Sequence, residues 1–147
     1  MGTEIERKFL VDEIKWKELE KGIAKSIVQG YLMKDPKRSV RIRISDDEAC
    51  MTIKLGDAGL SRSEFEYAIP LADARLLLAT IEKHIVKTRY KIPHHGKTWD
   101  VDVFHGAHEG LIIAEIELSV EDEKFDIPDW VSKEVTGESS YYNANLV

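Results

Sequence analysis

The stretch Ser39-Val40-Arg41-Ile42-Arg43-Ile44-Ser45 alternates strictly between polar and apolar side chains. Side chains two positions apart on a β-strand project from the same face, so a strand here puts both arginines on one side and the aliphatic residues on the other. An ordinary half-buried sheet turns its polar face to bulk water and carries a mixture of Ser, Thr, Lys and Glu there. The charge concentrated in this stretch therefore predicts a strand whose polar face serves a specific purpose.

The same alternation recurs on both sides of this segment. Each further segment places two or three charged residues, or Thr with Lys, at positions i and i+2, and the residues between them are mostly apolar. The segments are Glu4/Glu6/Lys8, Thr52/Lys54, Arg62/Glu64/Glu66, Lys87/Arg89/Lys91, Asp100/Asp102 and Glu115/Glu117. Their repetition predicts a barrel or deep cleft with a charged interior and an exterior covered by helices.

Turn and helix signals divide the chain into eight expected strands and a few helices. Asp12 before Ile14 and Trp16 predicts a short N-capped helix, the apolar spacing over residues 71–83 predicts a helix against the outer face of the sheet, and residues 139–146 are expected to form a short C-terminal helix. The expected strands are 3–11, 24–33, 39–45, 49–55, 62–69, 84–92, 98–104 and 111–119, with turns between them that include Gly56-Asp57-Ala58-Gly59. The predicted fold class is α+β, with an eight-stranded barrel that has room for one small ligand.

Composition limits the classes of protein that this chain can represent. Its 147 residues suit one domain over residues 1–147. The 27 acidic and 21 basic residues give a formal net charge of −6, which argues against a nucleic-acid-coating surface, because nonspecific affinity for phosphate backbones depends on excess Lys and Arg. The single Cys50 excludes an internal disulfide and a multi-cysteine metal site. A charged N-terminus, with no apolar run of about 18 residues, predicts a cytoplasmic protein without a membrane segment.

The charged residues on the predicted inner face suit a cation and a small anion bound together. Carboxylate pairs from separate strands can bind a hard divalent cation such as Mg²⁺, which prefers oxygen ligands and often shares them with phosphate. Glu4/Glu6 and Glu115/Glu117 are the candidates if the first and last strands meet when the barrel closes. The bases expected to hold phosphate oxygens are Arg41, Arg43, Lys54, Lys87 and Arg89.

The N-terminal Glu4-Ile5-Glu6-Arg7-Lys8 resembles the ExExK signature of the CYTH family, also called triphosphate tunnel metalloenzymes. Further blocks resemble family motifs in family order along the whole chain. They are Gln29-Gly30-Tyr31-Leu32, Arg41-Ile42-Arg43, Thr52-Ile53-Lys54, Ser63-Glu64-Phe65-Glu66, Lys87-Thr88-Arg89-Tyr90, Asp100-Val101-Asp102-Val103-Phe104, Glu115-Ile116-Glu117 and Glu134-Val135-Thr136-Gly137. The resemblance implies an eight-stranded antiparallel tunnel, which agrees with the strand pattern.

The resemblance also implies roles for individual residues. It implies a site for Mg²⁺, with Mn²⁺ as the alternative, formed by Glu4, Glu6, Glu115 and Glu117. It implies that the triphosphate is bound by Lys8, Arg41, Arg43, Lys54, Lys87 and Arg89. The residues it implies for catalysis are Glu4, Glu6, Lys8, Glu64, Glu66 and Asp102, and Asp100 shares the face of Asp102.

By this resemblance the expected activity is metal-dependent hydrolysis of a triphosphate inside the barrel. Inorganic triphosphate, split into pyrophosphate and phosphate, is favoured because the chain is short and offers little sequence for recognising a base or thiamine. The alternatives are a class IV-type adenylyl cyclase, a thiamine or nucleoside triphosphatase of the same fold, and a non-catalytic module that binds triphosphate or polyphosphate. The expected partner is a small-molecule triphosphate, with no nucleic acid and no membrane, and a homodimer is left open.

One position departs from the family pattern. The family's C-terminal helix commonly carries a basic residue just before its Tyr, and Ser140 stands there in Ser139-Ser140-Tyr141-Tyr142. This difference bears on how the corresponding end of the tunnel holds a terminal phosphate.

Overall fold

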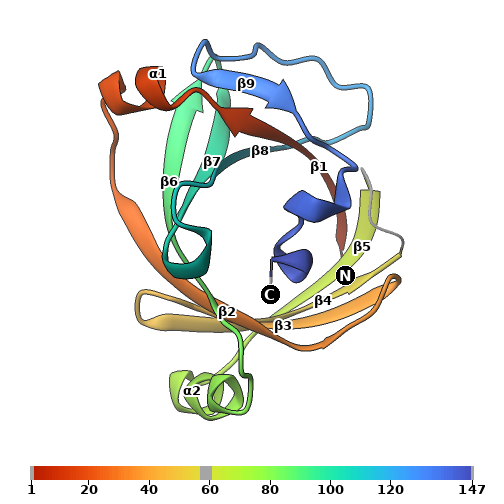
Figure 1. The fold of residues 1–147 in the computed structure, drawn as a ribbon. Helices are drawn as coiled ribbons and strands as arrows, with labels where there is room; N and C mark the ends of the chain where they lie inside the picture. The colour runs from red at the N-terminus through yellow and green to blue at the C-terminus, as the bar shows by residue number, and fades with distance from the viewer. Residues whose placement is uncertain (1, 57–60, 147) are drawn as a thin grey trace.

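A computed structural model of the chain describes residues 2–56 and 61–146. Within these residues nine strands form one antiparallel sheet in the order β5-β4-β3-β2-β6-β7-β8-β1-β9, and β5 also pairs with β1. The strands are β1 (Gly2–Val11), β2 (Ala24–Lys34), β3 (Arg38–Ser45), β4 (Glu48–Leu55), β5 (Ser61–Ala68), β6 (Ile85–His94), β7 (Lys97–Phe104), β8 (Ile112–Glu117) and β9 (Val131–Glu134). The β5–β1 pairing closes β1 to β8 into a barrel, seen end-on in Figure 1. The predicted eight-stranded antiparallel barrel is therefore confirmed.

Strand β1 lies between β5 and β8, so the first strand of the chain completes the barrel. On one side Glu4 is opposite Arg62 of β5. On the other side Glu6 is opposite Glu117, and Lys8 is opposite Glu115, of β8. The prediction that the first and last barrel strands meet is confirmed, and this register brings the glutamate pairs together.

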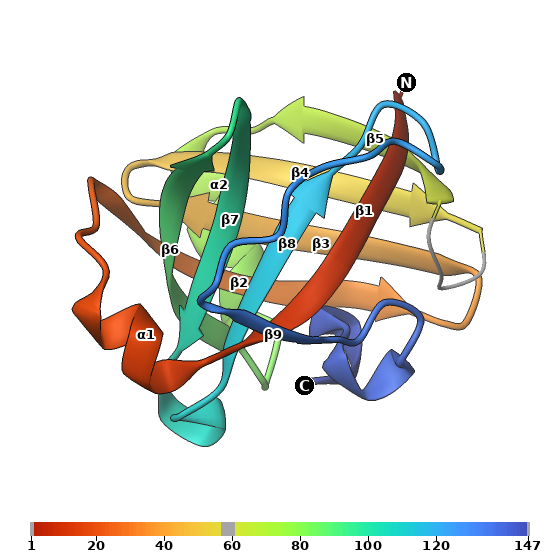
Figure 2. The same cartoon turned by 90° about the horizontal axis from the view of Figure 1, so that it is seen from above.

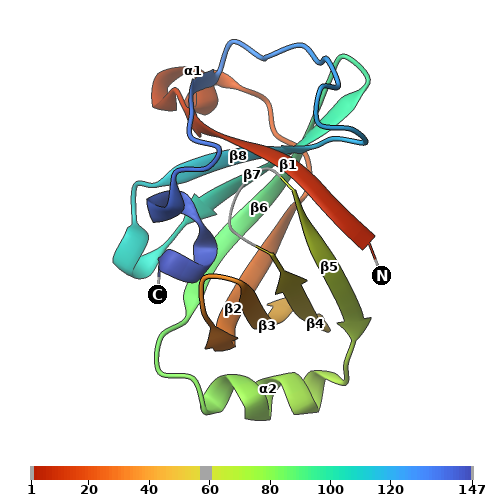
Figure 3. The same ribbon diagram turned by 90° about the vertical axis from the view of Figure 1, so that its right-hand side faces the viewer.

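The outer face of the barrel is apolar and covered in two places. Helix α2 (Leu71–Ala79) packs its Ala74 and Leu78 against Ile42 of β3. Helix α1 (Glu13–Glu18), capped by the Asp12 carboxylate, packs Trp16 into a second cluster with Trp99 and Trp130. Figures 1 and 3 show α2 on one side of the barrel and α1 with β9 on the other. The alternation in the sequence thus separates a charged inside from an apolar outside.

Gly30 of β2 faces the segment that follows α2. A Cβ atom at this position would lie 3.0 Å from Cγ2 of Ile81. Helix α2 ends at Ala79, earlier than the predicted residue 83, because the Thr80 N–H and hydroxyl donate to the Leu77 carbonyl and close the last turn. The chain then leaves the helix and places Ile81 directly on Gly30.

The C-terminal part differs from the expected arrangement. The predicted C-terminal helix is instead two separate 3-10 turns, η2 (Ser139–Tyr141) and η3 (Asn143–Asn145), which lie at one end of the barrel in Figures 1 and 2. Strand β9 was not predicted, because four residues are too few to show a clear alternation. A third 3-10 turn, η1 (Gly106–His108), precedes β8.

The expected turn Gly56-Asp57-Ala58-Gly59 falls mainly on residues 57–60, which lie outside the described residues. In the described part of the chain, no helix is both long enough and apolar enough to cross a membrane.

Candidate active site

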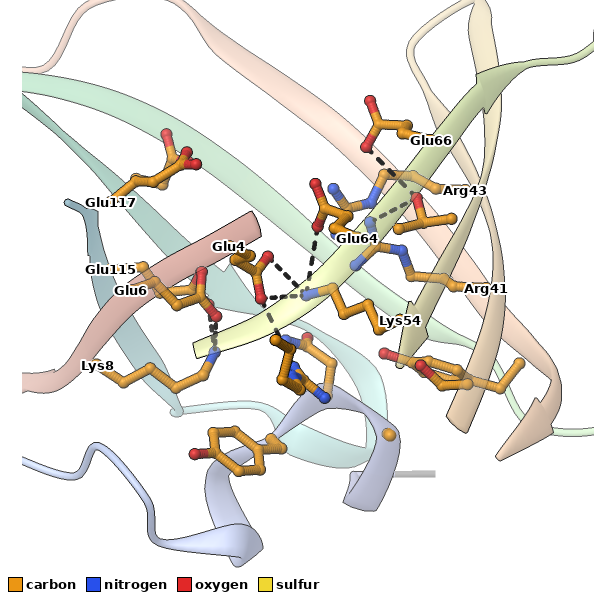
Figure 4. Close-up of a pocket in the computed structure, with 18 of the residues that line it drawn as sticks. Glu4, Glu6, Lys8, Arg41, Arg43, Lys54, Glu64, Glu66, Glu115 and Glu117 are labelled. Carbon is orange, nitrogen blue, oxygen red and sulfur yellow. Dashed lines mark hydrogen bonds and ion pairs between the residues drawn. The ribbon is translucent and has the colours of Figure 1, made fainter. Parts of the chain in front are cut away.

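Inward-pointing side chains enclose a polar cavity of about 170 Å³ inside the barrel, which we call the tunnel cavity (Figure 4). Seven barrel strands contribute acids or bases to it, because every second residue of each strand faces inward. Its walls carry the acids Glu4, Glu6, Glu64, Glu66, Asp100, Glu115 and Glu117, the bases Lys8, Arg41, Arg43, Lys54, Arg62 and Arg89, and Tyr31, Ser39, Thr52, Tyr142, Asn143 and Ala144.

One wall of the tunnel cavity is acidic. Figure 4 shows Glu4 and Glu6 of β1 near Glu115 and Glu117 of β8. Burial, followed by the charge of Glu115, raises the pKa of Glu6 to about 7. Burial also acts to raise the pKa of Glu115, but nearby cations, Lys8 first, hold it well below its ordinary value. Like-charged carboxylates held this close together gain stability when a cation binds between them.

Two lysines neutralise part of this acidic wall. The Lys8 Nζ donates to Glu115 at 2.7 Å and lies 3.5 Å from Glu6. The Lys54 Nζ donates to both carboxylate oxygens of Glu4 at 2.8 and 2.9 Å. These side chains are 4% and 13% exposed, so each ion pair lies in a site largely shielded from water. The two ammonium groups therefore balance part of the negative charge of these acids.

The opposite wall, on β3, carries two guanidinium groups without an acidic partner. Among the described residues neither Arg41 nor Arg43 is within 4.0 Å of a carboxylate oxygen. Arg41 donates one bond to Thr52 at 3.1 Å, and its buried Nε has no hydrogen-bond partner within residues 2–56 and 61–146. Arg43 donates to Gln29 at 2.7 Å. Burial, then Arg41 and Arg89, lowers the pKa of Arg43 to about 9, which leaves it charged at neutral pH.

A third cluster of charged residues, on β6 and β7, lies beside the tunnel cavity. The Asp102 carboxylate accepts bonds from Arg89 at 2.7 and 2.8 Å and from Lys87 at 2.7 Å. Asp102 and Lys87 are 1% and 0% exposed, and neither lines the tunnel cavity. Burial acts against ionisation, but Lys87 and Arg89 lower the pKa of Asp102 to about 2. Asp102 therefore fixes Arg89, which does line the cavity.

Strand β5 supplies two more acids at the side of the cavity. Glu64 lies 3.7 Å from the Lys54 Nζ, and burial together with the neighbouring Glu4 raises its pKa to about 7. Glu66 accepts a bond from the Thr52 hydroxyl at 3.4 Å, and that same hydroxyl accepts from Arg41. Glu66 thus acts on Arg41 through Thr52.

The C-terminal turns cover one end of the tunnel cavity. The ring of Tyr142 has the Lys8 ammonium 5.5 Å and the Arg62 guanidinium 5.6 Å from its centroid, and its hydroxyl accepts from the Gly137 N–H. The Asn143 side-chain carbonyl accepts from Lys87 at 3.2 Å. An aromatic face attracts cations, so Tyr142 positions both of these basic side chains.

The structure brings most of the predicted site residues to one cavity. Every one of them lines it except Lys87 and Asp102, which lie buried beside it. The cavity is also lined by residues that were not predicted from the sequence: Arg62, Tyr31, Ser39, Tyr142 and Asn143. Arg62 and Ser39 could have been found, because each lies two residues from a selected position on the same strand. The other three have no charge pattern to mark them.

The carboxylates of the acidic wall are the type of ligand that suits a divalent cation. No group of three or more His, Cys, Asp or Glu side chains among residues 2–56 and 61–146 already stands in metal-binding geometry. Yet Glu4, Glu6, Glu115 and Glu117 all line the same cavity, and carboxylate oxygens are the ligands that Mg²⁺ and Mn²⁺ prefer. Burial first, and then the charge of Glu115, raises the pKa of Glu6 to about 7, and a cation bound beside this carboxylate would lower it.

Comparison with known proteins agrees with this architecture. Residues 2–145 match the CYTH domain family. The chain is 46% identical to an inorganic triphosphatase of Acetivibrio thermocellus, covering 100% of this chain and 94% of that protein. It is 38% identical to an inorganic triphosphatase of Nitrosomonas europaea, covering 98% and 96%. A crystal structure of an inorganic triphosphatase superposes with a TM-score of 0.68 at 32% identity, covering 97% and 95% of the two chains.

The fold and the cavity define this protein as an antiparallel β-barrel with a charged tunnel. The sequence match over nearly the whole chain shows that this protein belongs to the CYTH domain family.

Proposed function

We propose that this protein is an inorganic triphosphatase, which hydrolyses inorganic triphosphate to pyrophosphate and phosphate. Two full-length relatives at 46% and 38% identity carry this activity in their names. We also propose that residues 1–147 form a single domain.

The unpaired arginines of β3 carry the proposal. Burying a cation is costly unless an anion accompanies it, and Arg41 and Arg43 lie in a largely enclosed cavity without a carboxylate partner in the described residues. In the part of the chain that the structure describes, the buried Nε of Arg41 lacks a hydrogen-bond partner. Guanidinium groups bind phosphate oxygens with two parallel hydrogen bonds, so a phosphate chain along β3 would satisfy both residues.

We assign the metal to the acidic wall. Glu4, Glu6, Glu115 and Glu117 would hold Mg²⁺ or Mn²⁺, which would supply positive charge to phosphate oxygens and lower the pKa of a bound water. When triphosphate enters, Lys8 and Lys54 can exchange their carboxylate partners for phosphate oxygens. The acids that they release then become available to the cation.

The remaining charged residues have supporting roles in this proposal. Arg41, Arg43, Lys54 and Arg89 bind equatorial and leaving oxygens, where fixed positive charge stabilises the transition state. Glu64, with its pKa near 7, orients the attacking water and takes its proton. The water oxygen forms a bond to the terminal phosphorus while the bond to the bridging oxygen breaks, and pyrophosphate leaves. Lys87 and Asp102 hold Arg89 in place, and Glu66 holds Arg41 through Thr52.

A product assay tests the proposal. Purified protein is given inorganic triphosphate, ATP or thiamine triphosphate with Mg²⁺, Mn²⁺ or EDTA, and phosphate, pyrophosphate and cyclic AMP are measured. We expect fast phosphate release from inorganic triphosphate that EDTA abolishes. Cyclic AMP with pyrophosphate from ATP would instead indicate a cyclase. Tight triphosphate binding without turnover would indicate a binding module.

A further inference from the structure

Gln29 of β2 is a buried polar residue that the proposed function leaves without a role. Its side chain is 0% exposed, and it is not among the described residues that line the tunnel cavity. Its amide oxygen nevertheless accepts a hydrogen bond from Nε of Arg43 at 2.7 Å, and Arg43 does line the cavity. The two residues stand directly opposite each other on β2 and β3, so their side chains project from the same face. Gln29 therefore reaches the site through Arg43.

The other neighbours of Gln29 are apolar. On β6 it stands opposite Ile85, which is 1% exposed and packs with Phe104 and Ile113. The amide nitrogen Nε2 of Gln29 is buried and has no hydrogen-bond partner within residues 2–56 and 61–146. A buried donor without a partner destabilises the folded state, so this amide is not the side chain that stability alone would favour.

A carboxylate at position 29 would suit the fold better than the amide does. Glutamate has nearly the same shape as glutamine, has no N–H to leave unpaired when ionised, and forms stronger, charge-assisted hydrogen bonds with a guanidinium group. The surroundings also favour a negative charge. Burial, followed by the charges of Arg41 and Arg89, lowers the pKa of Arg43 to about 9. The amide holds Arg43 in place without relieving this repulsion.

A second arginine of the tunnel cavity is held in a different way. Arg89 of β6 stands opposite Asp102 of β7, and the Asp102 carboxylate accepts from it at 2.7 and 2.8 Å. Both Arg89 and Arg43 thus use Nε to bind the residue opposite them on the neighbouring strand. The partner of Arg89 is an anion, whereas the partner of Arg43 is neutral. The same geometry therefore compensates the charge of Arg89 and leaves the charge of Arg43 in the cavity.

We propose that Gln29 is a positioning residue for the triphosphate: its amide oxygen fixes the direction of the Arg43 guanidinium, and its neutrality leaves the charge of Arg43 for a phosphate oxygen. This rests on the proposed function, because the anion that Arg43 would bind is the triphosphate. With Nε held by Gln29, the two Nη groups are the donors that turn toward phosphate.

Gln29→Glu is the test variant and Ser26→Glu is its matched control. Both substitutions add one carboxylate to β2. Ser26 is exposed and lies two residues from Val28, which packs with the apolar cluster beneath α2, so the control places its charge on the outer face. Gln29→Met is a second test variant, which removes the acceptor for Arg43 without adding charge.

Calorimetry in EDTA measures triphosphate binding without turnover, and urea titration measures stability. We expect Gln29→Glu to weaken triphosphate binding about tenfold, because its carboxylate competes with phosphate for Arg43. Gln29→Met should weaken binding about threefold and Ser26→Glu less than about twofold. The urea midpoint of Gln29→Glu should equal or exceed that of the wild type. A residue that only packs in the barrel would not lose affinity while stability is kept.

A double-mutant cycle shows whether Gln29 acts through Arg43. In an Arg43→Met background, Gln29→Met should cause no further loss of triphosphate affinity. An equal loss in both backgrounds would overturn the positioning role. Equal binding by Gln29→Glu and Ser26→Glu, or a urea midpoint of Gln29→Glu well below that of the wild type, would overturn the argument from charge.

Failure of the proposed function has a different signature. In that case the wild-type protein binds triphosphate but releases no phosphate from it with Mg²⁺. The calorimetric comparison of the Gln29 variants with Ser26→Glu does not depend on turnover, so it still decides whether Gln29 positions Arg43 for the anion.

Discussion

The two faces of each barrel strand meet different surroundings. On β7, Asp100 and Asp102 face the barrel interior, while Trp99 and Val101, which alternate with them, are fully buried in the outer cluster. On β3, Arg41 faces the tunnel cavity and Ile42 packs beneath α2. The outer face is held by apolar burial and the inner face by ion pairs. On the same strands, the outward-facing residues therefore contribute to stability and the inward-facing residues to activity. Substitutions on one face should change one property and leave the other nearly unchanged.

The largest effect is expected from an inner-face change. Glu4→Gln with Glu6→Gln removes two carboxylates of the acidic wall and keeps their shape. We expect triphosphate hydrolysis to fall about a thousandfold or more, because the cation that these carboxylates would hold beside the reacting phosphate is lost. The urea unfolding midpoint should stay close to that of the wild type. Retained turnover in a steady-state phosphate assay would remove both residues from the site.

An outer-face change is expected to have the opposite effect. Trp99→Ala removes a side chain that is 0% exposed and has its ring edge-on to Phe9 and Trp130 at 5.4 and 5.9 Å. We expect the free energy of unfolding to fall by about 3–5 kcal/mol, measured by urea titration, while KM of the folded fraction is unchanged. Ile14→Ala, at a side chain that is 73% exposed, is the control and should change stability little. An equal loss in both variants would contradict the assignment of Trp99 to the core.

A smaller effect, on the pH dependence of stability, is expected where the two environments meet. Lys87 points inward but is fully buried, and burial, opposed by Asp102 and reinforced by Arg43 and Arg89, lowers its pKa to about 7 from 10.5. Between these values the unfolded chain holds a proton that the folded chain has released, so stability rises with pH in this window.

Lys87→Met removes this titration while Arg89 still neutralises Asp102. Urea unfolding at pH 7, 8 and 9 should show the wild type gaining about 1 kcal/mol or more relative to the variant across that range. Parallel stability curves for the two proteins would show that Lys87 keeps its ordinary pKa.

The alternating segments predicted most of this structure because a period of two is a local property of the chain. All eight barrel strands and the inward-facing acids and bases follow from it. Arg62 and Ser39 fit the same alternation but were not predicted, whereas Tyr142 and Asn143 depend on long-range geometry. Tyr142 reaches Lys8 because the chain returns across the barrel end, and the same return lets Asn143 accept a hydrogen bond from Lys87. Ser140 lies in η2, and Arg62 of β5 lines the tunnel cavity beside Tyr142.

The position of β1 between β5 and β8 has a consequence for how the protein is made. Lys8 is joined to Glu115 across 107 residues of chain, and Arg7 to Glu134 across 127. The edge of β1 that pairs with β8 therefore stays unpaired until β8 has been synthesised, although β5 can pair with the other edge earlier. Contacts of such long sequence separation form slowly. The acidic wall is among the last parts of the molecule to assemble, so a chain released before β8 is complete lacks it.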